Sequence, residues 1–307
     1  MDKRHLLGAL ETGGTKTVCA TGYEDGTIVC REEIPTSTPE ETIPAISQWF
    51  VNKGASAVGI ASFGPTAVDP ASPDYGKILN TPKTAWVGYD LLGNLKTTLG
   101  VPCGYDTDVN AACLGEATFG CAKGIDDVLY LTIGTGVGAG VLIEGELLHG
   151  MLHPEAGHIP VIPDPRDPLA GKGACAFHRN CLEGYIAAPA IAKRWEGRTV
   201  ADLAGDEEAM DILSGYLAQA LATYALCYSP KKIIVGGTVA DGTPIVELAR
   251  AKTEELMGGY IVTPETADFD SYIVSGSLDG DQGVKGCLEL ARRALTNHDR
   301  HIGTVNL

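Results

Sequence analysis

The stretch VLYLTIGTGVGAGVLI, residues 128–143, holds a glycine- and threonine-rich turn between two apolar runs. A second stretch, GALETGGTKTVCA at residues 8–20, repeats this arrangement. Each predicts a strand, a tight turn and a second strand. Glycine lets the backbone approach a ligand closely, successive N–H groups of such a turn can surround an anion, and threonine hydroxyls add donors. One such turn would indicate an ordinary hairpin, but two matching ones favour phosphate binding.

Neither turn is a P-loop, because the pattern G-x4-G-K-[ST] is absent and each turn leads into a strand rather than a helix. The same context excludes a dinucleotide-binding fingerprint. A pair of phosphate-binding hairpins in the two halves of a chain is typical of the actin-like ATPase (ribonuclease H-like) fold, which holds ATP in a cleft between two domains. We therefore predict an α/β protein of this fold with an inter-domain cleft.

The rest of the chain alternates strand and helix patterns, as an α/β fold requires. A capping box from Thr38 to Glu41, with Pro39 at the first helical position, opens one helix, and Pro44 is expected to kink it. Apolar residues at a period of 3.6 indicate a second, longer helix. The predicted elements are helices over residues 38–54 and 210–230 and buried strands over residues 57–64 and 231–237. The tail from Asn297 shows no clear periodicity.

Composition limits the partners and the compartment. The chain has 307 residues, and its 39 acidic against 23 basic residues give a net charge of −16. Such a surface repels nucleic acid and anionic membranes, so neither is an expected partner. No signal peptide and no apolar run of membrane-spanning length are found, which predicts a cytoplasmic protein. The nine cysteines are an odd number, and seven of them stand singly in apolar stretches, which predicts reduced, mostly buried thiols.

The other two cysteines belong to GACAFHRNCLEG, residues 173–184, where Cys175, His178 and Cys181 follow one another at intervals of three. Thiolates and imidazole are the usual ligands of zinc. A structural zinc site normally has four ligands, so a fourth must come from elsewhere in the chain.

Several carboxylates are candidates for acid–base work or sugar binding. Asp108 falls at a strand-to-helix junction, where it could accept a proton from an attacking hydroxyl or could simply be an N-cap. Asp106 competes for the catalytic role, and Asn110 for the role of cap. Glu155, His158 and Glu183 could bind sugar hydroxyls, although each alone could be an ordinary surface or buried polar residue.

Together these segments resemble the ROK family (repressors, open reading frames, kinases) of sugar kinases, from end to end of the chain. The closest resemblance is to its bacterial zinc-containing fructokinases, on the evidence of Glu11 in the first hairpin, the pair Thr107-Asp108 and the C-x2-H-x2-C cluster. The motifs that carry the likeness are ETGGTK, IASFGP, TPK (residues 81–83), TDVNAACLGE, TIGTGVGAG, HPEAGH, LEG and IIVGGTV.

The resemblance implies a role for each matching residue. Asp108 would be the catalytic base, and His158 would complete a zinc site with Cys175, His178 and Cys181. Glu11 would act near Mg²⁺. The implied sugar ligands are Glu155, His158, Glu183, Gly64 and Pro65. The implied ATP-binding residues are Glu11, Gly13, Gly14, Thr15 and Lys16 in the first hairpin, Thr132, Gly134, Thr135 and Gly136 in the second, and Gly236 and Gly237 near the adenosine.

The resemblance further implies a homodimeric kinase that phosphorylates the 6-hydroxyl of fructose, with mannose as a second substrate. Its small domain would comprise residues 1–117 and a returning helix at 286–307, and its larger domain residues 118–285 with the zinc. Glucose or an N-acetylhexosamine is the alternative substrate, and a non-catalytic sugar-binding protein is the alternative class. A repressor of this family is not expected, because it would need a DNA-binding domain before the first hairpin and the negative charge of the chain disfavours DNA binding. One departure stands out: Thr238 follows Gly237 where the family usually has a third glycine.

Overall fold

The computed structural model describes residues 5–305, with side chains as far as His298. It divides into two compact units. The first takes the chain up to Gly124, together with Leu147–His153 and the chain from Leu278 onward, and the second takes Ile125–Glu146 and Pro154–Ser277. The predicted domain bounds at residues 117 and 286 are not tested by this division and stay a prediction. The outer bounds, residues 1 and 307, lie outside the described residues.

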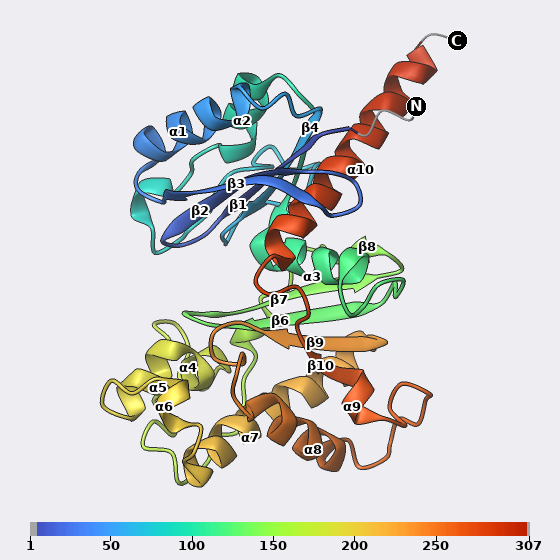
Figure 1. Cartoon of the computed structure of the whole chain (residues 1–307). Helices are drawn as coiled ribbons and strands as arrows, with labels where there is room; N and C mark the ends of the chain where they lie inside the picture. The colour runs from blue at the N-terminus through green and yellow to red at the C-terminus, as the bar shows by residue number, and fades with distance from the viewer. Residues whose placement is uncertain (1–4, 306–307) are drawn as a thin grey trace. The chain divides into compact units, whose positions relative to one another are not determined.

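The first unit is built on a mixed sheet of order β3-β2-β1-β4-β5. The strands β1 and β2 form the antiparallel hairpin predicted around the first turn, and β4 lies parallel to β1, as in Figure 1. Every residue of β4 is buried, which confirms the strand expected there. The strands are β1 Leu7–Thr12, β2 Lys16–Gly22, β3 Ile28–Pro35, β4 Ala57–Ser62 and β5 Cys103–Thr107.

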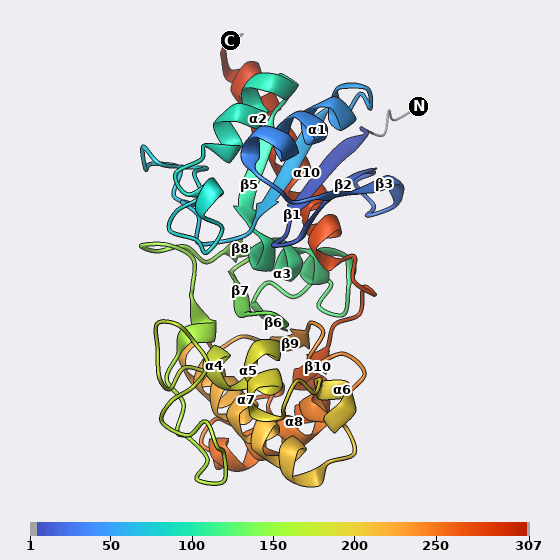
Figure 2. The same ribbon diagram turned by 90° about the vertical axis from the view of Figure 1, so that its left-hand side faces the viewer.

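Helices cover both faces of this sheet. Figure 2 shows α1 and α2 on one face, and α10 on the other. The helix α10 packs so closely that a Cβ on Gly59 of β4 would lie 1.8 Å from the carbonyl oxygen of Cys287, and one on Gly104 of β5 2.4 Å from that of Leu290. Only glycine fits at these two contacts. The helices are α1 Pro39–Val51, the 3₁₀ turn η1 Thr84–Trp86, α2 Leu91–Leu99, α3 Asp108–Phe119 and α10 Gln282–Val305.

Three details of these helices differ from expectation. The helix α1 begins after Thr38, but the Thr38 side chain makes no capping hydrogen bond, and the Glu41 carboxylate accepts from the Ser37 hydroxyl. The capping box was therefore wrong. The N-cap of α3 is Thr107, whose hydroxyl accepts from the N–H of Asn110 at 3.1 Å, so neither Asp108 nor Asn110 is the cap. The tail from Asn297 continues α10 as far as Val305.

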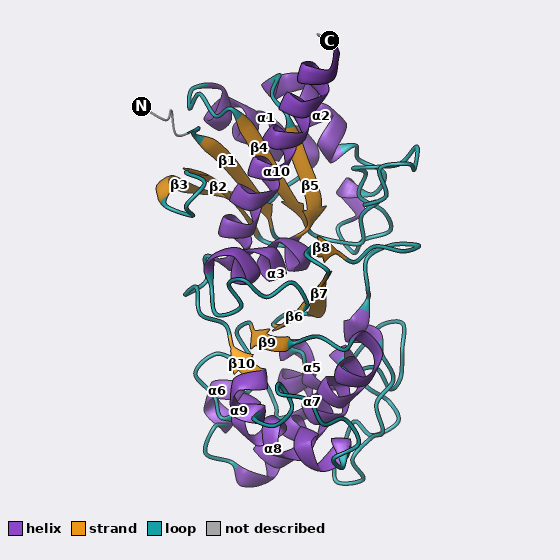
Figure 3. Ribbon diagram, turned by 90° about the vertical axis from the view of Figure 1, so that its right-hand side faces the viewer, coloured by secondary structure: helices purple, strands orange, loops and turns teal. Residues whose placement is uncertain are grey.

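The second unit is built on a sheet of order β10-β9-β6-β7-β8, in which β6 and β7 form the second predicted hairpin. The strand β9 runs parallel to β6 and ends at Gly236. The helices α7 and α8 pack together beside this sheet (Figure 3). The strands are β6 Val128–Ile133, β7 Val137–Ile143, β8 Glu146–Leu147, β9 Lys232–Gly236 and β10 Ile273–Ser275. The helices are η2 Ala156–His158, α4 Glu183–Ile186, α5 Ala188–Arg194, α6 Val200–Leu203, α7 Glu207–Tyr228, α8 Ile245–Met257 and α9 Phe269–Tyr272.

The apolar period read from the sequence is confirmed in α7, where Met210, Leu213, Leu217 and Tyr224 are buried. No helix of the described part of the chain is long and apolar enough to cross a membrane. The expectation of buried thiols holds only in part. Cys19, Cys113 and Cys287 are buried, but Cys227 is exposed because it falls on the outer face of α7.

Candidate active site and metal centre

The first hairpin turn, Gly13–Thr15, is held by backbone and side-chain bonds of the first unit. The N–H of Gly13 donates to the Lys16 carbonyl at 2.9 Å, and the Thr36 hydroxyl donates to the Gly13 carbonyl at 3.0 Å. The Thr12 hydroxyl donates to the Ala61 carbonyl of β4 at 3.1 Å. The turn is therefore fixed to the sheet, while Gly14 and Thr15 remain exposed. An exposed, braced Gly-Gly-Thr turn is suited to bind an anion.

Two carboxylates of the first unit lie near each other beside this turn. Glu11 is in the last part of β1, and Asp108 is the first residue of α3. Burial, and after it the negative charge of Asp108, raise the pKa of Glu11 to about 7. Asp108 Oδ1 accepts from the N–H of Val109 at 2.9 Å, at the positive end of α3. Glu11 therefore binds a proton more readily than an ordinary glutamate, unless a cation replaces that proton.

Asp106, the competitor for the catalytic role, is already fully engaged. Its Oδ1 accepts from the N–H of Thr107 at 2.8 Å and from Asn110 Nδ2 at 2.6 Å, and its Oδ2 lies 2.9 Å from His149 Nε2. Its side chain is only 4% exposed. A carboxylate with three donors in a buried position is poorly placed to accept a substrate proton, so the structure favours Asp108.

The second hairpin turn is packed against the end of β9 within the second unit. The N–H of Gly134 donates to the Gly136 carbonyl, and that of Val239 donates to the Ile133 carbonyl, both at 2.9 Å. Gly237 has φ +95°, and a Cβ there would lie 2.7 Å from Thr132 Oγ1. Only glycine therefore lets the chain turn so close to this hairpin. The exposed Thr238 is a near neighbour too, since a Cβ on Gly134 would lie 3.5 Å from its hydroxyl oxygen.

Glu183 connects the same hairpin to the region of the predicted sugar ligands. Its Oε2 accepts from the N–H of Val137 at 3.1 Å, and a Cβ on Gly136 would lie 2.9 Å from that oxygen. A Cβ on Gly157, between Glu155 and His158, would lie 1.9 Å from the Val137 carbonyl oxygen. The backbone around Val137 is thus shared by the second hairpin, Glu183 and the Glu155–His158 turn.

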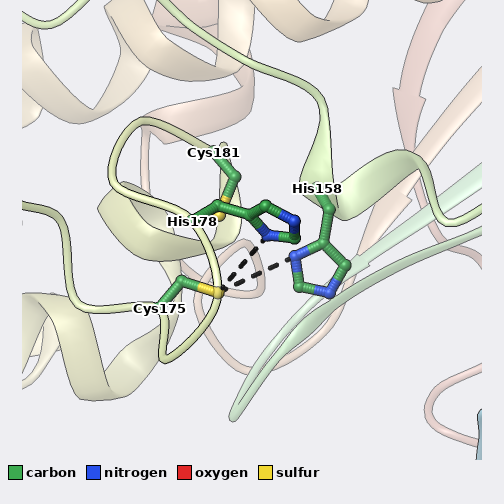
Figure 4. Close-up of side chains that lie close together, drawn as sticks. All are labelled: His158, Cys175, His178 and Cys181. Atoms are coloured by element: carbon green, nitrogen blue, oxygen red, sulfur yellow. Dashed lines mark hydrogen bonds between the residues drawn. The ribbon is translucent and has the colours of Figure 1, made fainter.

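Four side chains of the second unit converge in the way that metal ligands do. The ligand atoms of His158, Cys175, His178 and Cys181 all lie within 4.8 Å of one another. Figure 4 shows both imidazole rings turned toward Cys175, whose Sγ lies 3.9 Å from His158 Nδ1 and 3.7 Å from His178 Nδ1. Two thiols and two imidazoles are a ligand set that suits a closed, tetrahedral zinc site. The group can therefore hold a metal ion, and His158 lies where a fourth ligand would be needed.

The loop that carries this group is anchored by a second, separate set of contacts. Arg194 of α5 donates through Nε and Nη2 to the two carboxylate oxygens of Asp167, both at 2.7 Å, and neither side chain is exposed. The Tyr216 hydroxyl donates to Asp167 at 2.8 Å. A buried, bidentate pair of this kind fixes the loop geometry, because breaking it would leave a buried charge without compensation.

Comparison with known proteins decides the family. The model of the ROK family matches residues 7–294. The chain belongs to the ROK family. A ROK relative from Bacillus subtilis is 45% identical over 94% of this chain and 96% of its own, and a fructokinase from Pediococcus pentosaceus is 41% identical over 95% and 99%.

The solved structures of ROK proteins confirm the predicted fold. A ROK hexokinase from Thermus thermophilus superimposes with a TM-score of 0.77 at 23% identity, covering 95% of this chain and 99% of its own. A ROK glucokinase from Streptomyces griseus, solved with glucose and AMPPNP, gives 0.69 at 25% identity over 94% and 99%. The chain therefore has the two-domain α/β architecture of these kinases.

The predicted ROK site residues divide between the two units. The first unit holds Glu11, the first hairpin, Asp108, and Gly64 and Pro65 after β4, and the second unit holds the second hairpin, Gly236, Gly237, Glu155, Glu183 and the metal group. The ammonium of Lys16 lies 2.6 Å from the Glu33 carboxylate on the neighbouring strand, and its role in phosphate binding stays a prediction.

Two further polar residues were missed as site candidates. His149 has no sequence signal, because only the fold brings it to Asp106. Lys83 belongs to the TPK segment that carried part of the family resemblance, yet no role was given to it.

Proposed function

We propose that this chain is an ATP-dependent fructokinase that transfers the terminal phosphoryl group of ATP to the 6-hydroxyl of fructose, and that it also accepts mannose. The observation that supports this most strongly is a pair of braced Gly/Thr hairpins, each with sugar-kinase carboxylates beside it: Glu11 and Asp108 in one unit and Glu183 in the other. Three fructokinases that are 36–41% identical to this chain over nearly its full length support fructose over glucose.

The residues have distinct parts in this reaction. The hairpins donate N–H groups to the phosphates, because phosphoryl transfer depends on positioning and on neutralising charge. Glu155, His158 and Glu183 orient the sugar hydroxyls, and Asp108 accepts the proton of the attacking hydroxyl. Mg²⁺ bound to ATP would supply additional charge neutralisation, and Glu11 is the residue of the first unit that would face it.

The four candidate metal ligands fit zinc, and a zinc ion bound there would have a structural role. Its four protein ligands would leave no open position for chemistry. His158 offers Nδ1 to the other ligands, which leaves Nε2 free to contact a sugar hydroxyl and so to fix the ring. The metal would then act on the reaction by positioning a sugar ligand. We also propose that the protein works as a homodimer in the cytoplasm.

A coupled ADP-release assay with MgATP over a panel of fructose, mannose, glucose and N-acetylmannosamine tests the activity. We expect the highest kcat/KM for fructose, and fructose 6-phosphate as the product by NMR. A clearly higher kcat/KM for glucose or the N-acetylated sugar would overturn the fructokinase assignment, and no turnover of any sugar by protein that binds fructose would favour a sugar-binding protein.

A further inference from the structure

The segment TPK, residues 81–83, brings a lysine to the first hairpin turn. If Gly14 carried a Cβ, the nearest atom outside the turn and within 4 Å would be Cε of Lys83, at 3.7 Å. The side chain of Lys83 therefore runs beside the exposed Gly-Gly-Thr backbone, with its ammonium one bond further on.

Other contacts hold Lys83 in this position. Its ammonium lies over the ring of Phe63, 5.9 Å from the centroid, and Phe63 packs edge-on against Trp86. The N–H of Phe63 donates to the Thr12 hydroxyl at 3.2 Å, which ties this aromatic support to the hairpin. The N–H of Trp86 donates to the Lys83 carbonyl at 2.8 Å, and its indole N–H to the Ser37 carbonyl at 2.7 Å.

The Lys83 ammonium contacts an aromatic ring rather than a carboxylate. Among the described residues no carboxylate forms an ion pair with it, although the chain has an excess of 16 acidic residues. Lys16 and Lys77 of the same unit pair with Glu33 and Asp74 at 2.6 and 2.7 Å. A half-buried lysine without a carboxylate partner, beside an exposed Gly-Gly-Thr turn, is suited to bind a phosphate group.

We propose that Lys83 is a catalytic residue that binds the terminal phosphoryl group of ATP at the first hairpin, an inference that rests on the proposed kinase function. The terminal group is the one concerned, because this hairpin shares its unit with Asp108, and Glu11 beside the turn lies close to that proposed base. In the transfer, the bond from the terminal phosphorus to the oxygen of ADP breaks and a bond to the sugar oxygen forms. The hydroxyl proton goes to Asp108, and Lys83 remains protonated and offsets the charge of the moving group.

The test compares Lys83→Met and Lys83→Arg with the matched control Lys77→Met, which removes an exposed lysine of the same unit. Steady-state kinetics give kcat and the KM for fructose, and calorimetry without sugar gives the affinities for MgAMPPNP and MgADP. We expect Lys83→Met to lower kcat by about 10²- to 10³-fold with little change in KM for fructose, since that is the usual cost of losing one donor to developing charge. The affinity of this variant for MgAMPPNP should be lower, and its affinity for MgADP should be unchanged. Lys83→Arg should recover part of both losses, and Lys77→Met should behave as wild type.

Each contrary result has its own meaning. A kcat close to wild type in Lys83→Met overturns the proposal. An equal loss of affinity for MgAMPPNP and MgADP would show that Lys83 does not contact the terminal phosphate. A change confined to the KM for fructose would make Lys83 a sugar ligand instead. If wild-type protein binds MgAMPPNP but phosphorylates no hexose, the proposed function fails, while the nucleotide titrations still decide the role of Lys83. Far-UV circular dichroism and the thermal midpoint show whether each variant is folded. If Lys83→Met does not fold, the kinetics and affinities of Lys83→Arg decide the question.

Discussion

His149 Nε2 lies 2.9 Å from Asp106 Oδ2, and this contact ties the Leu147–His153 segment to the end of β5. The hydrogen bond that His149 donates to the Asp106 carboxylate raises the pKa of His149, although burial acts against the shift, and the charges of Asp106 and Asp69 add to it. The imidazole is therefore protonated to a higher pH in the folded chain than in the unfolded chain.

This raised pKa predicts how stability depends on pH. A group whose pKa is raised by folding contributes fully below its unfolded value, about 6.5, and loses its contribution as the pH rises through the folded value. We expect His149→Gln to cost about 1 kcal/mol of unfolding free energy at pH 6 and less at pH 9. Urea unfolding at both pH values measures this, with the exposed His298→Gln as control. An equal cost at the two pH values would show that the imidazole is not charged.

Glu11 predicts a dependence of the same sign, because burial raises the pKa of its carboxyl group and so favours the protonated, uncharged form in the folded chain. Its pKa is raised from 4.5 to about 7, so ionisation destabilises the fold increasingly between those values. With EDTA present, Glu11→Gln should equal wild type near pH 4.5 and exceed it at pH 8 by up to about 3 kcal/mol. Urea unfolding tests this. The control is Glu33→Gln, whose carboxylate has a pKa lowered by Lys16, so that variant should show no gain at pH 8.

Asp108→Asn separates the catalytic base from its neighbour Asp106. The variant should keep its thermal midpoint, because Thr107 caps α3, and lose about 10²- to 10⁴-fold in kcat. Asp106→Asn should mainly lose stability, since it weakens the contact with His149. The ADP-release assay and thermal unfolding on both variants measure the two effects. Normal turnover in Asp108→Asn would transfer the role of base to another residue.

Cys181→Ser tests the metal centre. We expect about one zinc per chain in the wild type, less in the variant, and a weaker affinity for fructose with nucleotide affinity little changed. Arg194 and Asp167 should keep the loop folded in either protein. Metal analysis and separate titrations of sugar and nucleotide measure this, and Cys227→Ser, an exposed thiol of α7, is the control. A metal-free preparation with full affinity for fructose would contradict the role given to zinc.

The sequence predicted those parts of the fold in which neighbouring residues decide the outcome. Both hairpins follow from glycine turns between apolar runs, and α7 from its period. The capping box failed because a competing hydroxyl, Ser37, takes Glu41, and residue spacing cannot rank two such partners.

Within the site, the C-x2-H-x2-C spacing indicated a metal site, but His158 was predicted as the fourth ligand only from the family likeness. The neighbours of Gly14 and Asp106 could not be predicted, since Lys83 and His149 reach them only after the first unit has folded. Such long-range contacts leave no local pattern in the chain.

The glycine-lined contact of α10 with β4 and β5 also determines when the protein can fold during its synthesis. The first unit needs residues around Cys287 and Leu290 to cover one face of its sheet, whereas the last residue of the second unit is Ser277. Translation proceeds from the N-terminus, and domains usually complete folding in that order. Here the second unit can complete its folding first. The strands β1 to β5 are synthesised earlier, but one face of their sheet stays uncovered until α10 has been made.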